Sequence, residues 1–179
     1  MNRNSNTLPA AELEANCLQL NALIDTEESH YRRLLRLAWR QNSYMKRQDV
    51  DRLDANASEW SRHLPAADRS RIARERLISQ MATNAGVQLP PAQVNDLLDH
   101  ALPVTKTRIE ASLAQLKLTV AHLARQNELN RNLAEFCLDL AHEESKIFKD
   151  GVLKDPSGCY GDDAKTADRG PGGFLVKQA

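Results

Sequence analysis

Apolar residues between positions 9 and 48 recur at alternating steps of four and three residues. This heptad spacing is typical of a helix that packs along one face against other helices. The face contains polar residues at Glu27 and Gln41, and its remaining members are Leu13, Cys17, Leu20, Ile24, Tyr31, Leu34, Ala38 and Met45. The pattern predicts one long helix that begins near Pro9. Such a rod cannot bury its seam alone, so it needs partner helices.

A second helix is predicted over residues 49–84. Asp49 suits the N-cap, and Gly86 followed by Pro90-Pro91 indicates where the helix ends. The expected apolar face consists of Val50, Leu53, Ala57, Trp60 and Leu64, and then Ile72, Leu77, Ile78 and Met81. Pro65 interrupts this face, and its ring predicts a kink or a short break.

A third helix is predicted from Pro103 to about Phe148, after a short helical turn within residues 92–101. Asp150-Gly151 indicates its end. Its seam is expected to begin with Ile109, Leu113, Leu116, Val120, Leu123, Asn127 and Asn130, and to resume one residue out of phase with Leu133, Cys137, Leu140, Glu144 and Ile147. The change of phase predicts apolar groups on two adjoining faces of this helix.

The composition agrees with an all-α fold. Six of the seven Gly follow residue 150, whereas β sandwiches and doubly wound α/β folds need Gly-rich turns throughout. We therefore expect an elongated antiparallel helical hairpin plus a third long helix in a coiled-coil-like bundle. Residues 1–150 would form this helical domain. Residues 151–179, rich in Gly and Asp, would form a flexible C-terminal tail.

The charge balance indicates which classes of partner are unfavourable, and the cysteines indicate the cellular compartment. Lys plus Arg and Asp plus Glu are 24 each, which argues against a protein that coats nucleic acid or membrane with its whole surface. No apolar run approaches the length of a membrane span, and residues 1–9 show no secretory signal. Three scattered Cys indicate a reducing cytoplasm. The basic residues Arg32, Arg36 and Arg40 could bind nucleic acid, but a solvated helix face is the favoured interpretation, and an acidic protein partner would fit them as well as nucleic acid does.

One pattern points to metal chemistry. Glu27-x-x-His30 has the spacing of a carboxylate-bridged di-iron site on a helix, and Asp139-x-x-His142 could supply its counterpart. Such a site also needs two further inward Glu, which the sequence does not offer. The chain contains no GxSxG, phosphate-binding loop or HExxH. We expect no enzyme activity, metal or cofactor, and a helical metalloprotein remains the less favoured alternative.

The order and spacing of several segments together resemble the FlgN-like flagellar export chaperones. The segments are Glu27-Glu28-x-x-Tyr31-x-x-Leu34-Leu35-x-Leu37, Arg71 to Gly86, Asn127 to Leu133, Cys159-Tyr160-Gly161 and a Gly-rich tail that finishes in Val176-Lys177-Gln178-Ala179. The resemblance implies a cytoplasmic chaperone without catalytic activity. It would hold the C-terminal helical segments of hook–filament junction proteins, prevent their premature assembly and deliver them to the membrane-bound export gate.

The client is expected to dock on the third helix, because its apolar stripe is longer than one hairpin partner needs to cover. The candidate client-binding residues are Val120, Leu123, Asn127, Asn130, Leu133, Cys137, Leu140, Ile147 and Phe148. Tyr160 in the tail is the candidate contact with the export gate. A second interpretation is another coiled-coil assembly protein, such as a different secretion-system chaperone or a structural tether.

Overall fold

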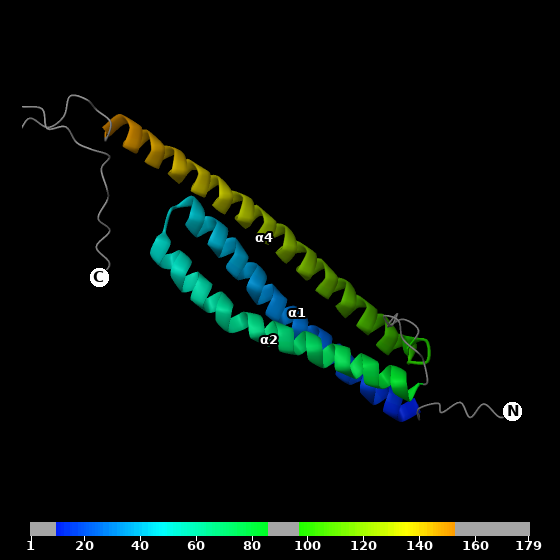
Figure 1. Ribbon diagram of the computed structural model, residues 1–179. Helices are drawn as coiled ribbons and strands as arrows, with labels where there is room; N and C mark the ends of the chain where they lie inside the picture. The colour runs from blue at the N-terminus through cyan, green and yellow to red at the C-terminus, as the bar shows by residue number, and fades with distance from the viewer. Residues whose placement is uncertain (1–9, 86–96, 153–179) are drawn as a thin grey trace, which may run out of the picture. The chain divides into compact units, whose positions relative to one another are not determined.

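The computed structural model describes residues 10–85 and 97–152, and these residues form long helices without any strand (Figure 1). The helices are α1 (Ala10–Lys46), α2 (Val50–Asn84) and α4 (Pro103–Val152). The predicted all-α fold is therefore confirmed. The chain divides into two compact units after Arg131, so that α4 contributes its first part to one unit and its remainder to the other. Pro103 is the first residue of α4, as predicted, but the helix continues past Asp150-Gly151.

A tight turn joins α1 to α2 in an antiparallel hairpin (Figure 1). Gln48 has a φ of 55°, in the left-handed region, and its backbone N–H donates to the carbonyl of Met45. The backbone N–H of Asp49 donates to the carbonyl of Tyr44, which completes a Schellman motif. The Asp49 carboxylate then accepts from the backbone N–H of Arg52, 3.2 Å away, and caps α2 as predicted. One residue thus ends one helix and begins the next.

The predicted seam of α1 is confirmed along its whole length, since every member is buried or half-buried. The seam of α2 differs from the prediction in its first half, where Val50, Ala57 and Leu64 are exposed. The packed positions are instead Leu53, Asn56, Trp60, His63, Ala67, Ser70, Arg74, Leu77 and Met81. These positions also step by threes and fours, but four of them are polar. The seam predicted from hydrophobicity alone therefore differs from the packed positions in the first half of α2.

Two of the polar residues on the α2 seam are matched by groups of α1. The Asn56 amide donates to the carbonyl of Leu37 over 3.2 Å, and Arg74 donates to Glu27 over 2.6 Å. A buried polar group costs little when it is hydrogen-bonded, so these positions tolerate Asn and Arg. Pro65 lies on the exposed side, and α2 continues through it. Of the two effects predicted for Pro65, a kink or a short break, the break is thus wrong.

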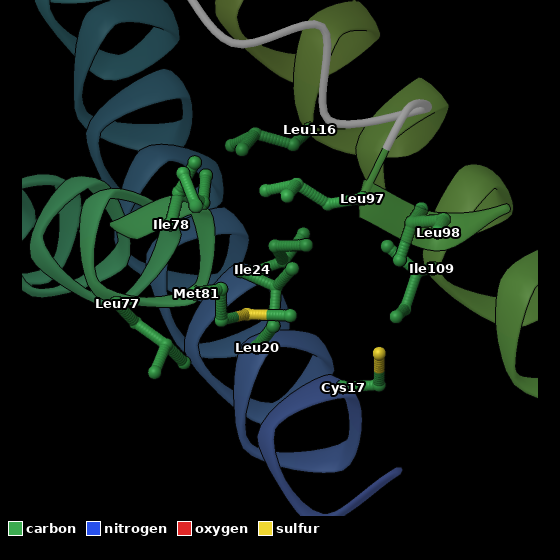
Figure 2. Close-up of a cluster of buried hydrophobic side chains, with 11 residues drawn as sticks. Cys17, Leu20, Ile24, Leu77, Ile78, Met81, Leu97, Leu98, Ile109 and Leu116 are labelled. Carbon is green, nitrogen blue, oxygen red and sulfur yellow. The ribbon is translucent and has the colours of Figure 1, made fainter. Parts of the chain in front are cut away.

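The hydrophobic core of the first unit consists of two clusters along α1. The first, near the start of α1, contains Cys17, Leu20, Ile24, Leu77, Ile78, Met81, Ala82, Leu97, Leu98, Ile109 and Leu116. Figure 2 shows these side chains pointing toward one another from α1, α2, α4 and the helical turn that precedes α4. The second cluster lies closer to the hairpin turn and contains Leu34, Leu35, Leu37, Ala38, Ala67 and Leu123.

Within the first unit, α4 runs parallel to α1. Three hydroxyl groups of α4 donate to carboxylates of α1: Thr105 to Glu14, Ser112 to Asp25 and Thr119 to Glu28. The partners in these three bonds are 87 to 91 residues apart. A nearly constant separation is the signature of two parallel helices in one register.

The Glu27–Arg74 pair should make a large contribution to the stability of the hairpin. Arg74→Met keeps the side-chain volume but leaves the buried Glu27 carboxylate without its cation, and we expect it to lower the free energy of unfolding by about 3 kcal/mol. Urea denaturation followed by helical circular dichroism measures this loss. Arg76→Met, at an exposed position of the same helix, should change stability by less than about 0.5 kcal/mol.

The double variant Glu27→Leu with Arg74→Met completes this test. It removes both charges, so most of the lost stability should return. A double variant that is less stable than Arg74→Met alone would contradict this account of the pair.

Candidate functional site

The seam of α4 is a single heptad pattern that runs without interruption from Thr105 to Ile147. In the packed part it uses Thr105, Ile109, Ser112, Leu116, Thr119, Leu123, Gln126 and Asn130, all buried or half-buried. The predicted change of phase is wrong, because the sequence pattern had favoured Val120 over its neighbour. Thr119 is 4% exposed, whereas Val120 is 38% exposed. The polar Thr119 belongs to the seam because Glu28 accepts its hydroxyl hydrogen over 2.8 Å.

A cluster of side-chain amides surrounds Asn130 at the last buried position of α4. The Asn130 amide donates to the carbonyl of Ala38 over 2.8 Å and to the side-chain oxygen of Gln41 over 3.1 Å. Its own oxygen accepts from Asn42 and from Gln126, each over 3.0 Å. Asn130 thus uses its donor and acceptor groups, and no register shifted along α1 would preserve this arrangement.

Beyond Asn130 the same heptad continues on residues that are solvent-exposed or half-buried. We call these residues the exposed seam and define it as Leu133, Cys137, Leu140, Glu144 and Ile147, with Phe136 and Phe148 beside them. Leu133 is half-buried, and the other members are exposed. Ile147 is 71% exposed and Phe136 is 64% exposed. Large apolar side chains that gather on one face of a helix mark an interaction surface.

The structure sorts the predicted client-binding residues into two groups. Leu123 and Asn130 are buried within the first unit, in the second core cluster and in the amide cluster. The half-buried or exposed residues are Val120, Asn127, Leu133, Cys137, Leu140, Ile147 and Phe148. Tyr160, the predicted gate contact, lies outside the described residues, as does the tail from residue 153 onward.

The predicted client-binding residues did not include Phe136, Leu129 or Leu138, although all three are at least half exposed. Phe136 is four residues before Leu140, and Leu129 is four residues before Leu133, so both lie on the same side of α4 as the exposed seam. This spacing could have identified them. Leu138 is two residues from Leu140 and therefore faces the opposite side of the helix.

In the Glu27-x-x-His30 pattern, which suggested a metal site, Glu27 instead contacts a residue of α2. Glu27 is 2% exposed and accepts from Arg74, a contact that neutralises the charge of its carboxylate. Among the described residues no group of three or more His, Cys, Asp or Glu side chains is placed to hold a metal ion.

The basic residues of α1 mostly contact carboxylates. Arg32 pairs with Glu28 over 2.8 Å, and both Arg33 and Arg40 lie against Glu59 of α2. The hydrogen bond from Arg33 holds the pKa of Glu59 below its ordinary value. This arrangement supports the interpretation of a solvated helix face, because much of the positive charge is compensated on the molecule itself.

No helix among the described segments has both the length and the apolar character that crossing a bilayer requires.

The comparison with protein families decides the family. The family model FlgN, described as FlgN protein, matches residues 18–168. The chain belongs to the FlgN family. The match covers α1 from residue 18 onward and all of α2 and α4, and it confirms the resemblance inferred from the sequence. No curated protein and no solved structure gives a significant match.

Membership of the FlgN family assigns the chain to the flagellar export chaperones, which bind substrates of flagellar export and are not an enzyme family. A chaperone of this kind needs a surface that accepts a partly folded segment of its client. The exposed seam has the apolar character and the regular spacing for this purpose.

The amide cluster provides a test of how α4 is held on α1. Asn130→Ala removes four hydrogen bonds from a buried site, and we expect it to lower the free energy of unfolding by about 1–3 kcal/mol. Asn127→Ala, at an exposed position almost one turn earlier, should cost less than about 0.5 kcal/mol. Thermal denaturation of both variants measures the difference. Equal losses of stability in the two variants would show that the amide cluster does not hold α4 in its position on α1.

Proposed function

We propose that this FlgN-family chaperone binds the C-terminal helical segments of flagellar hook–filament junction proteins on the exposed seam of α4. Binding would cover the apolar face of the client, prevent its premature assembly and keep it competent for the flagellar type III export gate. Residues 151–179 would act as a separate tail, with Tyr160 in contact with the gate at hand-over.

One observation carries the docking part of this proposal. The seam of α4 is a continuous heptad whose first part packs against α1, while its second part offers the same positions to solvent. A helix face with heptad spacing is complementary to another helix with the same spacing. An amphipathic client helix would therefore lie along the exposed seam as α1 lies along the packed part.

The chemistry of the seam changes between its two parts, which favours a client of strongly apolar character. At every seventh residue the packed part has Thr105, Ser112, Thr119 and Gln126, whereas the exposed seam has Leu133, Leu140 and Ile147. Covering one Leu or Ile side chain contributes roughly 1.5–3 kcal/mol. Several such side chains together can supply the affinity of a chaperone for its client, after the cost of association is subtracted.

A pair of leucines separated by two residues tests this docking site. Leu140→Asp places a charge on the exposed seam and should weaken binding of a junction-protein C-terminal segment by at least about tenfold. Leu138→Asp introduces the same charge at a residue of similar exposure on the opposite side of α4, and it should bind as the wild type does. Isothermal titration calorimetry measures both affinities, with helicity checked by circular dichroism.

Two results would overturn the docking site. Unchanged binding by the Leu140→Asp variant would place the client elsewhere, and the α1–α2 hairpin would be the next surface to test. Binding that survives removal of the C-terminal segment from the junction protein would show that this segment is not the client element.

The two cysteines of the described residues allow a second test, without substitutions. Cys137 is exposed on the seam, whereas Cys17 is buried, and burial raises the pKa of the Cys17 thiol. The thiolate is the reactive form, so iodoacetamide at pH 8 should modify Cys137 rapidly and Cys17 only after unfolding. A bound junction-protein segment should slow the modification of Cys137.

Mass spectrometry of the separate cysteine peptides follows this reaction, and Cys17 serves as the internal control. A Cys137 modification rate that does not change at saturating client would contradict docking on the exposed seam.

A further inference from the structure

The exposed seam contains one charged residue, Glu144, among apolar neighbours. The side chains adjacent to it on the same helix, three and four residues away, belong to Leu140, Ala141, Ile147 and Phe148. None of these four is a cation or a hydrogen-bond donor. A client helix that covers the exposed seam therefore removes water from the Glu144 carboxylate. The neighbouring side chains of α4 do not neutralise this charge.

A second glutamate, Glu27, also lies on a helix seam between apolar neighbours, and the structure contains the residue that pairs with it. Glu27 lies on the seam of α1, with Leu23 four residues before it and Tyr31 four residues after it, as Leu140 and Phe148 flank Glu144. Glu27 is buried, and Arg74 reaches it from α2 with a 2.6 Å contact. In this fold, a seam glutamate is thus buried together with an arginine from the helix that covers it.

A counter-charge would stabilise a covered Glu144 in the same way. Burying a carboxylate without a counter-charge is strongly unfavourable, and the attraction between paired charges offsets much of that cost when the geometry is good. We propose that the occupant of the exposed seam is an amphipathic helix that carries an Arg or Lys within its apolar face, and that this cation pairs with Glu144. The inference rests on the proposed function, since it specifies the client helix that docks there.

The surrounding charges favour a basic occupant. Asp139 and Glu143 are exposed on one edge of the seam, and acidic residues outnumber basic ones over residues 132–150. A second copy of the same surface is a poor occupant, because the exposed seam contains no cation that could meet Glu144. Charge complementarity thus selects a client with a basic residue in its apolar face.

Designed peptides test this selectivity with the full-length chain. Three helical peptides would share one length and one leucine face, and would carry Arg, Leu or Glu at the central position of that face. We expect the wild type to bind the Arg peptide about 10- to 100-fold more tightly than the Glu peptide, because a charge-assisted hydrogen bond is replaced by repulsion. Fluorescence anisotropy of labelled peptides measures the affinities.

Substitution of Glu144 should reverse the preference. The Glu144→Leu variant should prefer the Leu peptide to the Arg peptide, and Glu144→Gln should bind the Arg peptide about tenfold more weakly than the wild type does. Glu135→Gln is the matched control, since nine residues at about 100° each place it on the opposite side of α4. A wild type that binds the Leu peptide most tightly, or binds none of the three, would overturn the inference.

A junction-protein segment separates this inference from the proposed function. If Leu140→Asp abolishes binding of that segment while Glu144→Gln leaves it unchanged, the docking site stands and the cation pairing is wrong. If the junction segment does not bind, yet the wild type prefers the Arg peptide and Glu144→Leu reverses that preference, the pairing stands and the client assignment fails.

Discussion

Two neighbouring carboxylates of α1, Glu27 and Glu28, constrain the positions of both helices that pack against it. Consecutive residues of a helix point about 100° apart, so one carboxylate reaches Arg74 of α2 and the other reaches Thr119 of α4. Apolar heptads alone can slip by one repeat at little cost, because Leu and Ile are interchangeable partners. A slip would separate Glu27 from Arg74 and Glu28 from Thr119, which costs more than exchanging one apolar partner for another. Together with the contacts of Asn56 and Asn130, these two carboxylates therefore fix the register of the three long helices.

The two parts of α4, before and after Asn130, differ in the side chains at every seventh position. Where α4 packs on α1, hydroxyl and amide groups at every seventh residue meet acceptors, and they alternate with the buried Ile109, Leu116 and Leu123. Past Asn130 those positions become Leu133, Leu140 and Ile147, which are half-buried or exposed. One surface thus serves a fixed internal partner, whereas the other would serve the proposed client, whose apolar side chains and cation would match the exposed seam.

Local pattern was sufficient to predict the helices, the Asp49 cap and the seam of α1, because these depend on hydrophobic spacing and on capping chemistry. It misplaced the seam wherever the packed residue is polar. Asn56 and Thr119 are buried only because Leu37 and Glu28 accept their hydrogen bonds, and those partners are distant in sequence. The break expected at Pro65 did not occur, since on the exposed side a carbonyl that loses its helical donor can bond to water instead. The exposed seam was largely recognised, because its apolar residues retain the heptad spacing. The buried roles of Leu123 and Asn130 required knowledge of the neighbouring helix.

The parallel register of α1 and α4 has a consequence for the order of folding. Contacts between α1 and α2 begin at a tight turn, so the hairpin can grow from a local nucleus. Every hydrogen bond between α1 and α4 closes a loop of 87 to 92 residues, and such distant contacts carry a larger entropic cost of closure. The hairpin should therefore form first and serve as a template for α4. During synthesis α1 and α2 leave the ribosome before α4 does, so the helix that bears the exposed seam is organised only after its support is complete.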